Sequence, residues 1–218
     1  MLTAEAALRM DRMYRHQRYI YDATRKFYLL GRDRMIRDLN PAADDRVLEL
    51  GCGTGRNLIL AARRFPRAAF YGIDISEEML AVAKTNIERA GLSSRIHLAK
   101  ADATQFDAVW LLGTGAFERV FISYSISMIP RWREVLRNAT ELLSARGELH
   151  VVDFGDQRGL PQWFAATLLH WLALFHVTPR ADLELQMTAI ADYEAAELHF
   201  ARPFRGYAQY AVLRPALT

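Results

Sequence analysis

The residues best suited to chemistry form a glycine-spaced turn directly after an apolar run. The run Val47-Leu48-Glu49-Leu50 continues into Gly51-Cys52-Gly53-Thr54-Gly55. Glycines let the backbone turn sharply and approach a ligand without a Cβ in the way. Turns of this kind also join strands to helices for structural reasons alone. The pattern predicts a strand, a turn and a helix, and it makes four residues candidates for cofactor binding: Glu49, Gly51, Gly53 and Gly55.

Two aspartates follow later apolar runs at positions that suit the rest of a nucleoside. Asp74 closes the run that begins at Phe70, nineteen residues past Gly55, where a carboxylate is placed to accept from both ribose hydroxyls. Asp102 follows the next run and is placed to accept from an adenine amino group, with Ala103 beside it. Ile75 and Met79 are candidates for the apolar walls of the adenine pocket, although a core role explains both equally well.

A dinucleotide site is the first alternative for such a turn. Its pattern, GxGxxG, places a third glycine where a helix packs closely on a strand, whereas Asn57, Leu58 and Ile59 follow Gly55 here. A pyrophosphate would also be repelled by Glu49. The residues therefore favour an adenosyl cofactor that carries no phosphate.

This arrangement of acid, glycine turn, ribose acid and adenine acid resembles the class I S-adenosylmethionine-dependent methyltransferases. The resemblance implies S-adenosylmethionine as the cofactor, with Glu49 near the methionine ammonium and Gly51 and Gly53 beside the methionine part. It implies that Asp74 binds the ribose and Asp102 the adenine. The single cysteine of the chain excludes a cysteine-rich metal cluster, and no metal is expected.

The methyl acceptor should meet the end of the fourth strand, in the run from Phe121 to Pro130. Ser123 and Tyr124 are candidates for the methyl-transfer pocket, and ordinary strand-end packing is the alternative for both. The run has no NPPY-type tetrapeptide, which argues against nucleic-acid and glutamine acceptors, so no nucleic-acid partner is expected. When an amine is methylated, positive charge moves towards its nitrogen, and aromatic rings and oxygens accommodate that charge.

The N-terminal stretch is basic and periodic. The segment from Arg9 to Asp38 contains nine Lys or Arg residues and four Asp residues, whereas the formal net charge of the whole chain is only +3. We expect one helix from Leu8 to Leu39 that ends at Asn40-Pro41. Tyrosines recur every seven residues in it, and an arginine follows each by four, so each series lies along one side. Either the helix caps the cofactor, or it docks on the core as an amphipathic helix. In the first case Tyr21 is a catalytic candidate, and the candidates for acceptor binding are Tyr14, Arg18, Arg25 and Tyr28.

The order of elements predicts the fold. Short apolar runs alternate with helical stretches, and this alternation indicates a parallel sheet. Two further strands, 196–204 and 207–213, are expected to form a hairpin around Arg205-Gly206. We therefore expect an α/β, Rossmann-like fold: a mostly parallel seven-stranded sheet with helices on both faces and a C-terminal antiparallel hairpin. With 218 residues, 51% of them hydrophobic, one domain is expected, with residues 1–40 as a helical cap and 41–218 as the core. The five parallel runs are 47–50, 70–73, 96–99, 119–123 and 148–152.

An apolar stretch from Pro161 to Val177 follows the fifth run. It is shorter than the roughly 20 residues that a spanning helix needs. It is either a buried core helix or a lid that touches lipid, with Trp163 and Trp171 as interface anchors. The lone cysteine and the absence of a secretory pattern predict a cytoplasmic protein, and peripheral contact with the inner membrane surface is left open.

A closer resemblance concerns the run Met10 to Asp22 and its continuation through Arg25 to Asp33. Together with Val151 to Asp156 and the C-terminal part, it is similar to the bacterial BtaB-type diacylglycerylhomoserine N-methyltransferases of betaine-lipid synthesis. The resemblance implies three N-methylations of a homoserine lipid head group, and a partner enzyme that makes this lipid from diacylglycerol. One alternative is a phosphatidylethanolamine or small-amine N-methyltransferase, because arginine suits a phosphate and a carboxylate equally. The other alternative is a non-catalytic cofactor-binding module.

Overall fold

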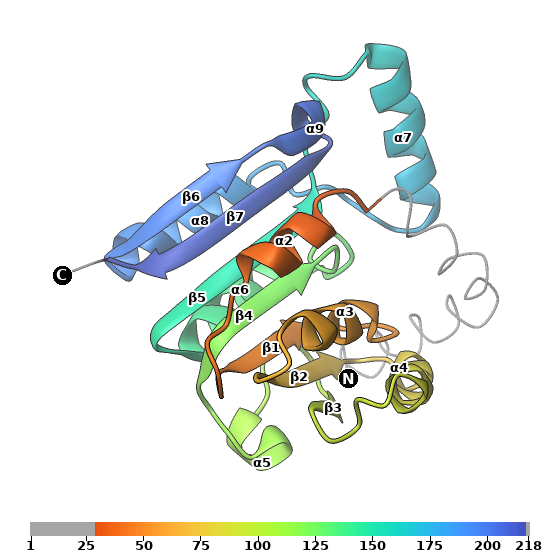
Figure 1. The fold of residues 1–218 in the computed structure, drawn as a ribbon. Helices are drawn as coiled ribbons and strands as arrows, with labels where there is room; N and C mark the ends of the chain where they lie inside the picture. The colour runs from red at the N-terminus through yellow and green to blue at the C-terminus, as the bar shows by residue number, and fades with distance from the viewer. Residues whose placement is uncertain (1–28, 217–218) are drawn as a thin grey trace.

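The protein folds around one seven-stranded sheet with the strand order β3-β2-β1-β4-β5-β7-β6 (Figure 1). The computed structural model describes residues 29–216. Strands β1 to β5 pair in parallel, and β7 pairs antiparallel with both β5 and β6. The expected fold class is confirmed. The strands are β1 (Arg46–Leu50), β2 (Ala69–Asp74), β3 (Ile96–Lys100), β4 (Phe117–Ser123), β5 (Leu143–Phe154), β6 (Ala196–Ala201) and β7 (Ala208–Pro215).

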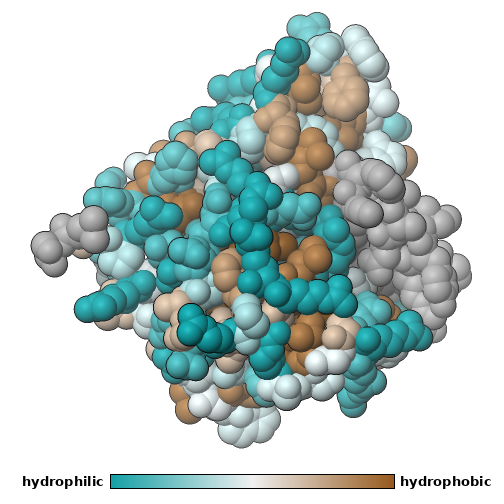
Figure 2. Space-filling model, in the orientation of Figure 1, coloured by the Kyte–Doolittle hydropathy of each residue, from teal (hydrophilic) through white to brown (hydrophobic). Residues whose placement is uncertain are grey.

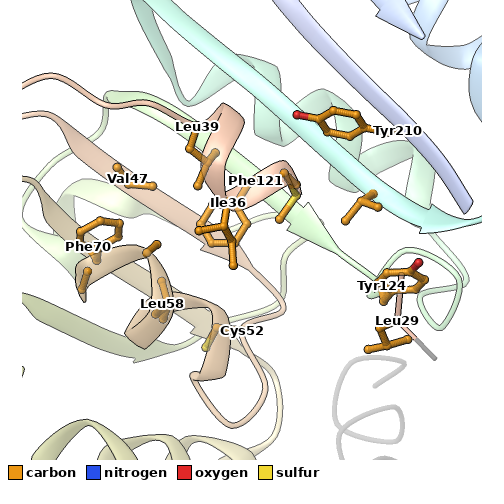
Figure 3. Close-up of a cluster of buried hydrophobic side chains, with 14 of the residues drawn as sticks. Leu29, Ile36, Leu39, Val47, Cys52, Leu58, Phe70, Phe121, Tyr124 and Tyr210 are labelled. Atoms are coloured by element: carbon orange, nitrogen blue, oxygen red, sulfur yellow. The ribbon is translucent and has the colours of Figure 1, made fainter. Parts of the chain in front are cut away.

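Helices cover both faces of the sheet (Figure 1). The described helices are α2 (Arg32–Asp38), α3 (Arg56–Arg64), α4 (Glu77–Arg89), α5 (Ala108–Leu112), α6 (Trp132–Glu141), α7 (Gln162–Leu174), α8 (Leu183–Tyr193) and α9 (Pro203–Gly206). Side chains alternate across a strand, and so the core divides into two clusters. Phe121 packs with α2 and α3 on one face (Figure 3), whereas its neighbours Val120 and Ile122 pack with α6 and α8 on the other.

The expected continuous helix up to Leu39 is wrong in its described part. Gly31 has φ +89° and stands before α2, which begins only at Arg32. A left-handed residue at this point prevents the helix from continuing from the residues before it. Arg32 is therefore the first residue of a separate helix, not part of a longer helical stripe as the spacing of the arginines suggested. Helix α2 instead packs on the sheet through Met35 and Leu39, which are fully buried.

The C-terminal hairpin differs from the expectation at its turn. The sixth strand ends at Ala201 rather than at Phe204, and the short helix α9 follows. Phe204 and Arg205 have φ +56° and +58°, a conformation that cannot extend a strand. The loop after β5 packs directly on this turn, because the backbone N–H groups of Gln157 and Gly159 donate to carbonyls of α9. The turn is therefore joined to the segment that leads into α7.

Among the described residues, no helix is long and apolar enough to cross a membrane.

Candidate active site

The glycine turn after β1 has the geometry that its sequence suggests. Gly51, Gly53 and Gly55 have φ +76°, +53° and +73°, a region that only glycine enters at little cost. A Cβ on Gly51 would lie 2.7 Å from the Cβ of Ser125, in the loop after β4. The N–H groups of Gly51 and Cys52 both donate to the Ile73 carbonyl at 2.9 Å. The turn is thus held against the ends of β2 and β4 with no room for a side chain at Gly51.

Asp74 links this turn to the end of β2. Its Oδ2 accepts the backbone N–H of Gly53 at 2.8 Å, and its Oδ1 accepts that of Ser76 at 3.0 Å. Hydrogen bonds to a carboxylate favour its charged form and fix its orientation. Asp74 is half-buried and carries further lone pairs, which suit ribose hydroxyls.

Asp102 is held in a similar way after β3. Its Oδ1 accepts both the N–H of Thr104 at 2.9 Å and the hydroxyl of the same residue at 2.7 Å. Ile75 is half-buried, whereas Met79 and Ala103 are buried. Because β1, β2 and β3 are parallel neighbours, Gly51, Asp74 and Asp102 all follow the carboxyl ends of adjacent strands.

Glu49 is the acidic group on the methionine side of the predicted site. Its side chain is 1% exposed, and its Oε1 accepts the Asn57 amide at 2.8 Å. Asn57 belongs to the first turn of α3, directly after the glycine turn. A buried carboxylate needs hydrogen bonds or an opposite charge to offset its desolvation. An ammonium group brought beside Glu49 would supply such a charge.

A cavity of about 420 Å³ opens beside Glu49 and the glycine turn. It reaches from Ser123 at the end of β4 along the groove between α3 and α4. Of the predicted site residues it contacts Glu49, Gly51, Gly53 and Ser123, and it does not extend to Asp74 or Asp102. Gly55 does not line it either: a Cβ there would meet Ala83 of α4 at 3.2 Å, so Gly55 serves close helix packing. The described lining residues are Leu29, Arg32, Glu49, Gly51, Cys52, Gly53, Thr54, Arg56, Asn57, Ile59, Leu60, Arg63, Asn86, Arg89, Ala90 and Ser123.

Ser123 and Tyr124, the predicted acceptor-side pair, lie in different surroundings. The Ser123 hydroxyl is buried in the cavity wall and has no hydrogen-bond partner in the described part of the chain. Tyr124 is 2% exposed, has φ +54°, and donates its hydroxyl to the Leu30 carbonyl at 2.5 Å. Burial raises the pKa of Tyr124 well above its ordinary value, so the phenol stays protonated. Figure 3 shows the ring next to Leu29. The geometry gives Ser123 access to a ligand and gives Tyr124 a role in fixing the segment before α2.

Arg32 was not among the predicted binding residues. Its side chain is 6% exposed and lines the cavity together with Glu49 and Ser123. The sequence signal that could have identified it is Gly31, since a glycine inside a helical pattern marks a break. The five predicted residues of the N-terminal stretch lie outside the described residues: Tyr14, Arg18, Tyr21, Arg25 and Tyr28.

Two further groups near the site are buried and structural. Asp153 is fully buried, and its two oxygens accept the N–H groups of Ser127 and Phe154. Burial raises the pKa of Asp153 to about 6. Cys52 is 5% exposed inside the glycine turn, and burial raises the pKa of its thiol well above the ordinary value. Asp153 is enclosed and does not line the cavity. Cys52 lines it, but as a protonated thiol. Neither group therefore presents a proton-accepting charge to the cavity.

The described residues fit S-adenosylmethionine. The cradle at Gly51 leaves no room for a side chain, and a buried acid and an unpaired hydroxyl line the same cavity. Asp74 would hold the ribose, Asp102 the adenine, and Glu49 the methionine ammonium. Among residues 29–216, no three His, Cys, Asp or Glu side chains gather as a metal site.

This sheet order, with a glycine turn after the first strand and a carboxylate closing the second, is the fold of class I S-adenosylmethionine-dependent methyltransferases. Residues 47–147 match the family described as a methyltransferase domain, which indicates an S-adenosylmethionine-dependent methyltransferase. An O-methyltransferase family protein from Burkholderia thailandensis superposes with a TM-score of 0.70 at 18% identity, covering 93% of this chain and 61% of that one. The geranyl diphosphate C-methyltransferase of Streptomyces coelicolor, solved with S-adenosyl-L-homocysteine, gives a TM-score of 0.64 at 14% identity, covering 85% and 75%.

Curated relatives match over part of their length. A phosphatidylethanolamine N-methyltransferase from Cereibacter sphaeroides is 33% identical over 119 residues, which are 54% of this chain and 55% of that protein. A release factor glutamine methyltransferase from Gloeobacter violaceus is 44% identical over 73 residues, 31% of this chain and 26% of the relative. The alignments thus span about a quarter to a half of these relatives.

Proposed function

We propose that the chain methylates the amine of a lipid head group, with diacylglycerylhomoserine as the acceptor and three successive transfers to the trimethylated betaine lipid. The resemblance of the N-terminal run to BtaB-type enzymes supports this acceptor. A partner enzyme would then have to supply the homoserine lipid. Phosphatidylethanolamine is the second candidate acceptor, and the Cereibacter sphaeroides relative favours it.

The observation that carries the proposal is the charge of the cavity wall. Four arginines line it in the described part of the chain, and Glu49 is the one acid among those lining residues: the arginines are Arg32, Arg56, Arg63 and Arg89. The acid suits the ammonium group of the cofactor, and the cofactor brings a single carboxylate to these four arginines. The remaining guanidinium groups suit a second anion, the carboxylate or phosphate of an acceptor head group.

The same arginines favour the reactive form of the acceptor. An amine attacks only through its free lone pair, and nearby positive charges lower the pKa of an ammonium group. Bound S-adenosylmethionine supplies an activated methyl group. The role of the protein in the reaction is to align the amine with this methyl group. Alignment of reacting groups lowers the barrier by roughly 7–11 kcal/mol. Ser123 lies where its oxygen can accept from the amine or accommodate the positive charge that forms on nitrogen.

Mass spectrometry of lipids tests the acceptor. Purified protein and S-adenosylmethionine are incubated with vesicles that contain diacylglycerylhomoserine, phosphatidylethanolamine or neither. We expect mass gains of one, two and three methyl groups on the homoserine lipid. Gains on phosphatidylethanolamine alone would replace the acceptor by the second candidate. If the cofactor binds and neither lipid gains mass, the acceptor is a soluble amine or the domain is a non-catalytic binding module. Asp74→Ala is the matched inactive control.

A further inference from the structure

Helix α7 is apolar on all sides and still exposed. It carries no charged residue, and Leu172 is its single buried residue. Trp163 is 72% exposed and Leu174 63% exposed. A helix that is hydrophobic all round is normally covered, because exposed apolar surface is unfavourable in water. The described part of the protein leaves most of this helix without a cover.

The exposed side of α7 runs along the whole helix, with apolar residues towards its two ends and the exposed polar residues Thr167 and His170 between them. Trp163 and Leu174 are eleven residues apart, about three turns, so they lie on one stripe of the helix, whereas Leu172 lies on the opposite side. Of the two tryptophans expected to anchor at an interface, only Trp163 faces outwards. Trp171 is half-buried, packs against the core, and its ring centroid lies 5.0 Å from that of Phe175. The outward stripe is therefore separate from the side that holds α7 to the body.

Helix α7 lies at the same edge of the sheet as the cavity. It follows the carboxyl end of β5, and the glycine turn and Ser123 lie at the carboxyl ends of β1 and β4, which run parallel to β5. Figure 1 shows α7 projecting beyond α9 at this edge. In Figure 2, brown side chains gather in the upper part of the molecule, over these two helices. Phe204 of α9 is 49% exposed and adds to this surface.

Arginines outnumber acids around this surface: Arg158, Arg202 and Arg205 lie with two acids, Asp156 and Glu184. Residues 157–181 contain no Asp or Glu. Arg158 and Arg205 are exposed at the start of α7 and on α9, and Asp156 is shared by Arg158 at 3.2 Å and Arg202 at 3.5 Å. Apolar side chains flanked by arginines are complementary to the acyl and phosphate layers of an anionic bilayer.

We propose that α7, with Phe204 and Arg205 of α9, inserts into the interface of an anionic membrane through the stripe of Trp163 and Leu174. This inference deepens the proposed function, because it names the surface from which a lipid acceptor would enter the cavity. Vesicle binding is measured without turnover, so failure of this inference is distinguishable from failure of the proposed acceptor.

The test compares the full chain with Trp163→Gln/Leu174→Gln. Both are co-sedimented with vesicles of phosphatidylcholine and phosphatidylglycerol, without cofactor or acceptor lipid. We expect the double variant to partition at least about tenfold less, because two large apolar side chains no longer enter the bilayer. Binding of the parent should also weaken as salt is raised. Brominated lipids should quench tryptophan emission in the parent and much less in the variant.

Trp110→Gln is the matched control. Trp110 is 81% exposed on α5, which precedes the amino end of β4, at the opposite edge of the sheet. This variant should bind vesicles like the parent, and thermal unfolding should show that all three proteins fold equally well. Equal sedimentation of parent and double variant would overturn the proposal. So would a parent that ignores vesicles but forms dimers that the double substitution dissociates, because a second copy would then cover α7.

Discussion

The backbone N–H of Gly53 donates to Oδ2 of Asp74 at 2.8 Å, so the carboxylate that ends β2 also holds the turn that follows β1. One side chain thus lies at the position predicted to bind the ribose and also holds the turn predicted to border the methionine part of the cofactor. Loss of this carboxylate should disturb both.

Asp74→Ala should weaken the binding of S-adenosylmethionine by at least about tenfold, since it removes charge-assisted hydrogen bonds to the turn and to the ribose. Asp74→Asn keeps one acceptor oxygen and should lose less. Calorimetric titration with the cofactor measures both, and circular dichroism checks the fold. Unchanged affinity in the alanine variant would remove Asp74 from the site.

Gly51→Ala should destabilise the protein more than Gly91→Ala. Both glycines have positive φ, +76° and +69°, so both variants incur the strain of a left-handed residue, about 1–2 kcal/mol. A methyl group at Gly91 meets nothing within 4 Å, whereas at Gly51 it meets Ser125. The extra clash should add about 1–3 kcal/mol. Denaturant unfolding gives the difference, and equal losses would show that the loop after β4 moves away freely.

Ser123→Ala should leave the free energy of unfolding unchanged or raise it, because a buried hydroxyl without a partner is removed. Methyl transfer should fall if this hydroxyl meets the ligand. Tyr124→Phe is the contrasting variant: it strips the Leu30 carbonyl of its partner and should cost about 1–2 kcal/mol of stability. A Ser123 variant with reduced stability and full activity would contradict the assignment.

Asp153 should make the protein less stable as pH rises from about 4 to about 6. Its pKa is about 6 in the folded protein against an ordinary 3.8, so in this range the folded chain keeps a proton that the unfolded chain has released. Integrated over that window, the free energy of unfolding should fall by about 3 kcal/mol and stay reduced above it. Asp153→Asn should abolish this pH dependence, although the amide loses one backbone hydrogen bond at every pH. A parallel pH dependence in both proteins would show that Asp153 titrates normally.

The strands and the glycine turn were predictable because their signals are local. A mostly apolar run that begins at Val47 and is followed by glycines at Gly51 and Gly53 specifies a strand and a tight turn whatever surrounds it. The positions of Asp74 and Asp102 at one edge of the sheet were predictable from the same logic, since the ends of parallel strands meet there. Gly55 shows the limit of this logic: it matches the motif, yet its environment is Ala83 of α4.

Features that depend on tertiary context were not predictable in the same way. The apolar stretch that forms α7 was equally consistent with a buried core helix. Hydropathy alone does not show whether the rest of the protein covers an apolar helix. Arg32 was assigned to a helical stripe that Gly31 interrupts, and only the folded chain places it beside Ser123. Helix α8 was not among the expected elements. The turn at Phe204 and Arg205 was missed as well, since a strand pattern does not reveal where φ becomes positive.

The reactivity of the buried Cys52 thiol also provides a direct measure of how often the glycine turn opens. The chain has one cysteine, and it lies inside the turn with its sulfur packed against Gly72 and its thiol protonated. A maleimide or dithiobisnitrobenzoate reagent should therefore react much faster when the turn opens or the protein unfolds than with the closed turn. The rate of labelling would measure the opening of the glycine turn without any engineered probe. A ligand that keeps the turn closed would slow the reaction in proportion to its occupancy.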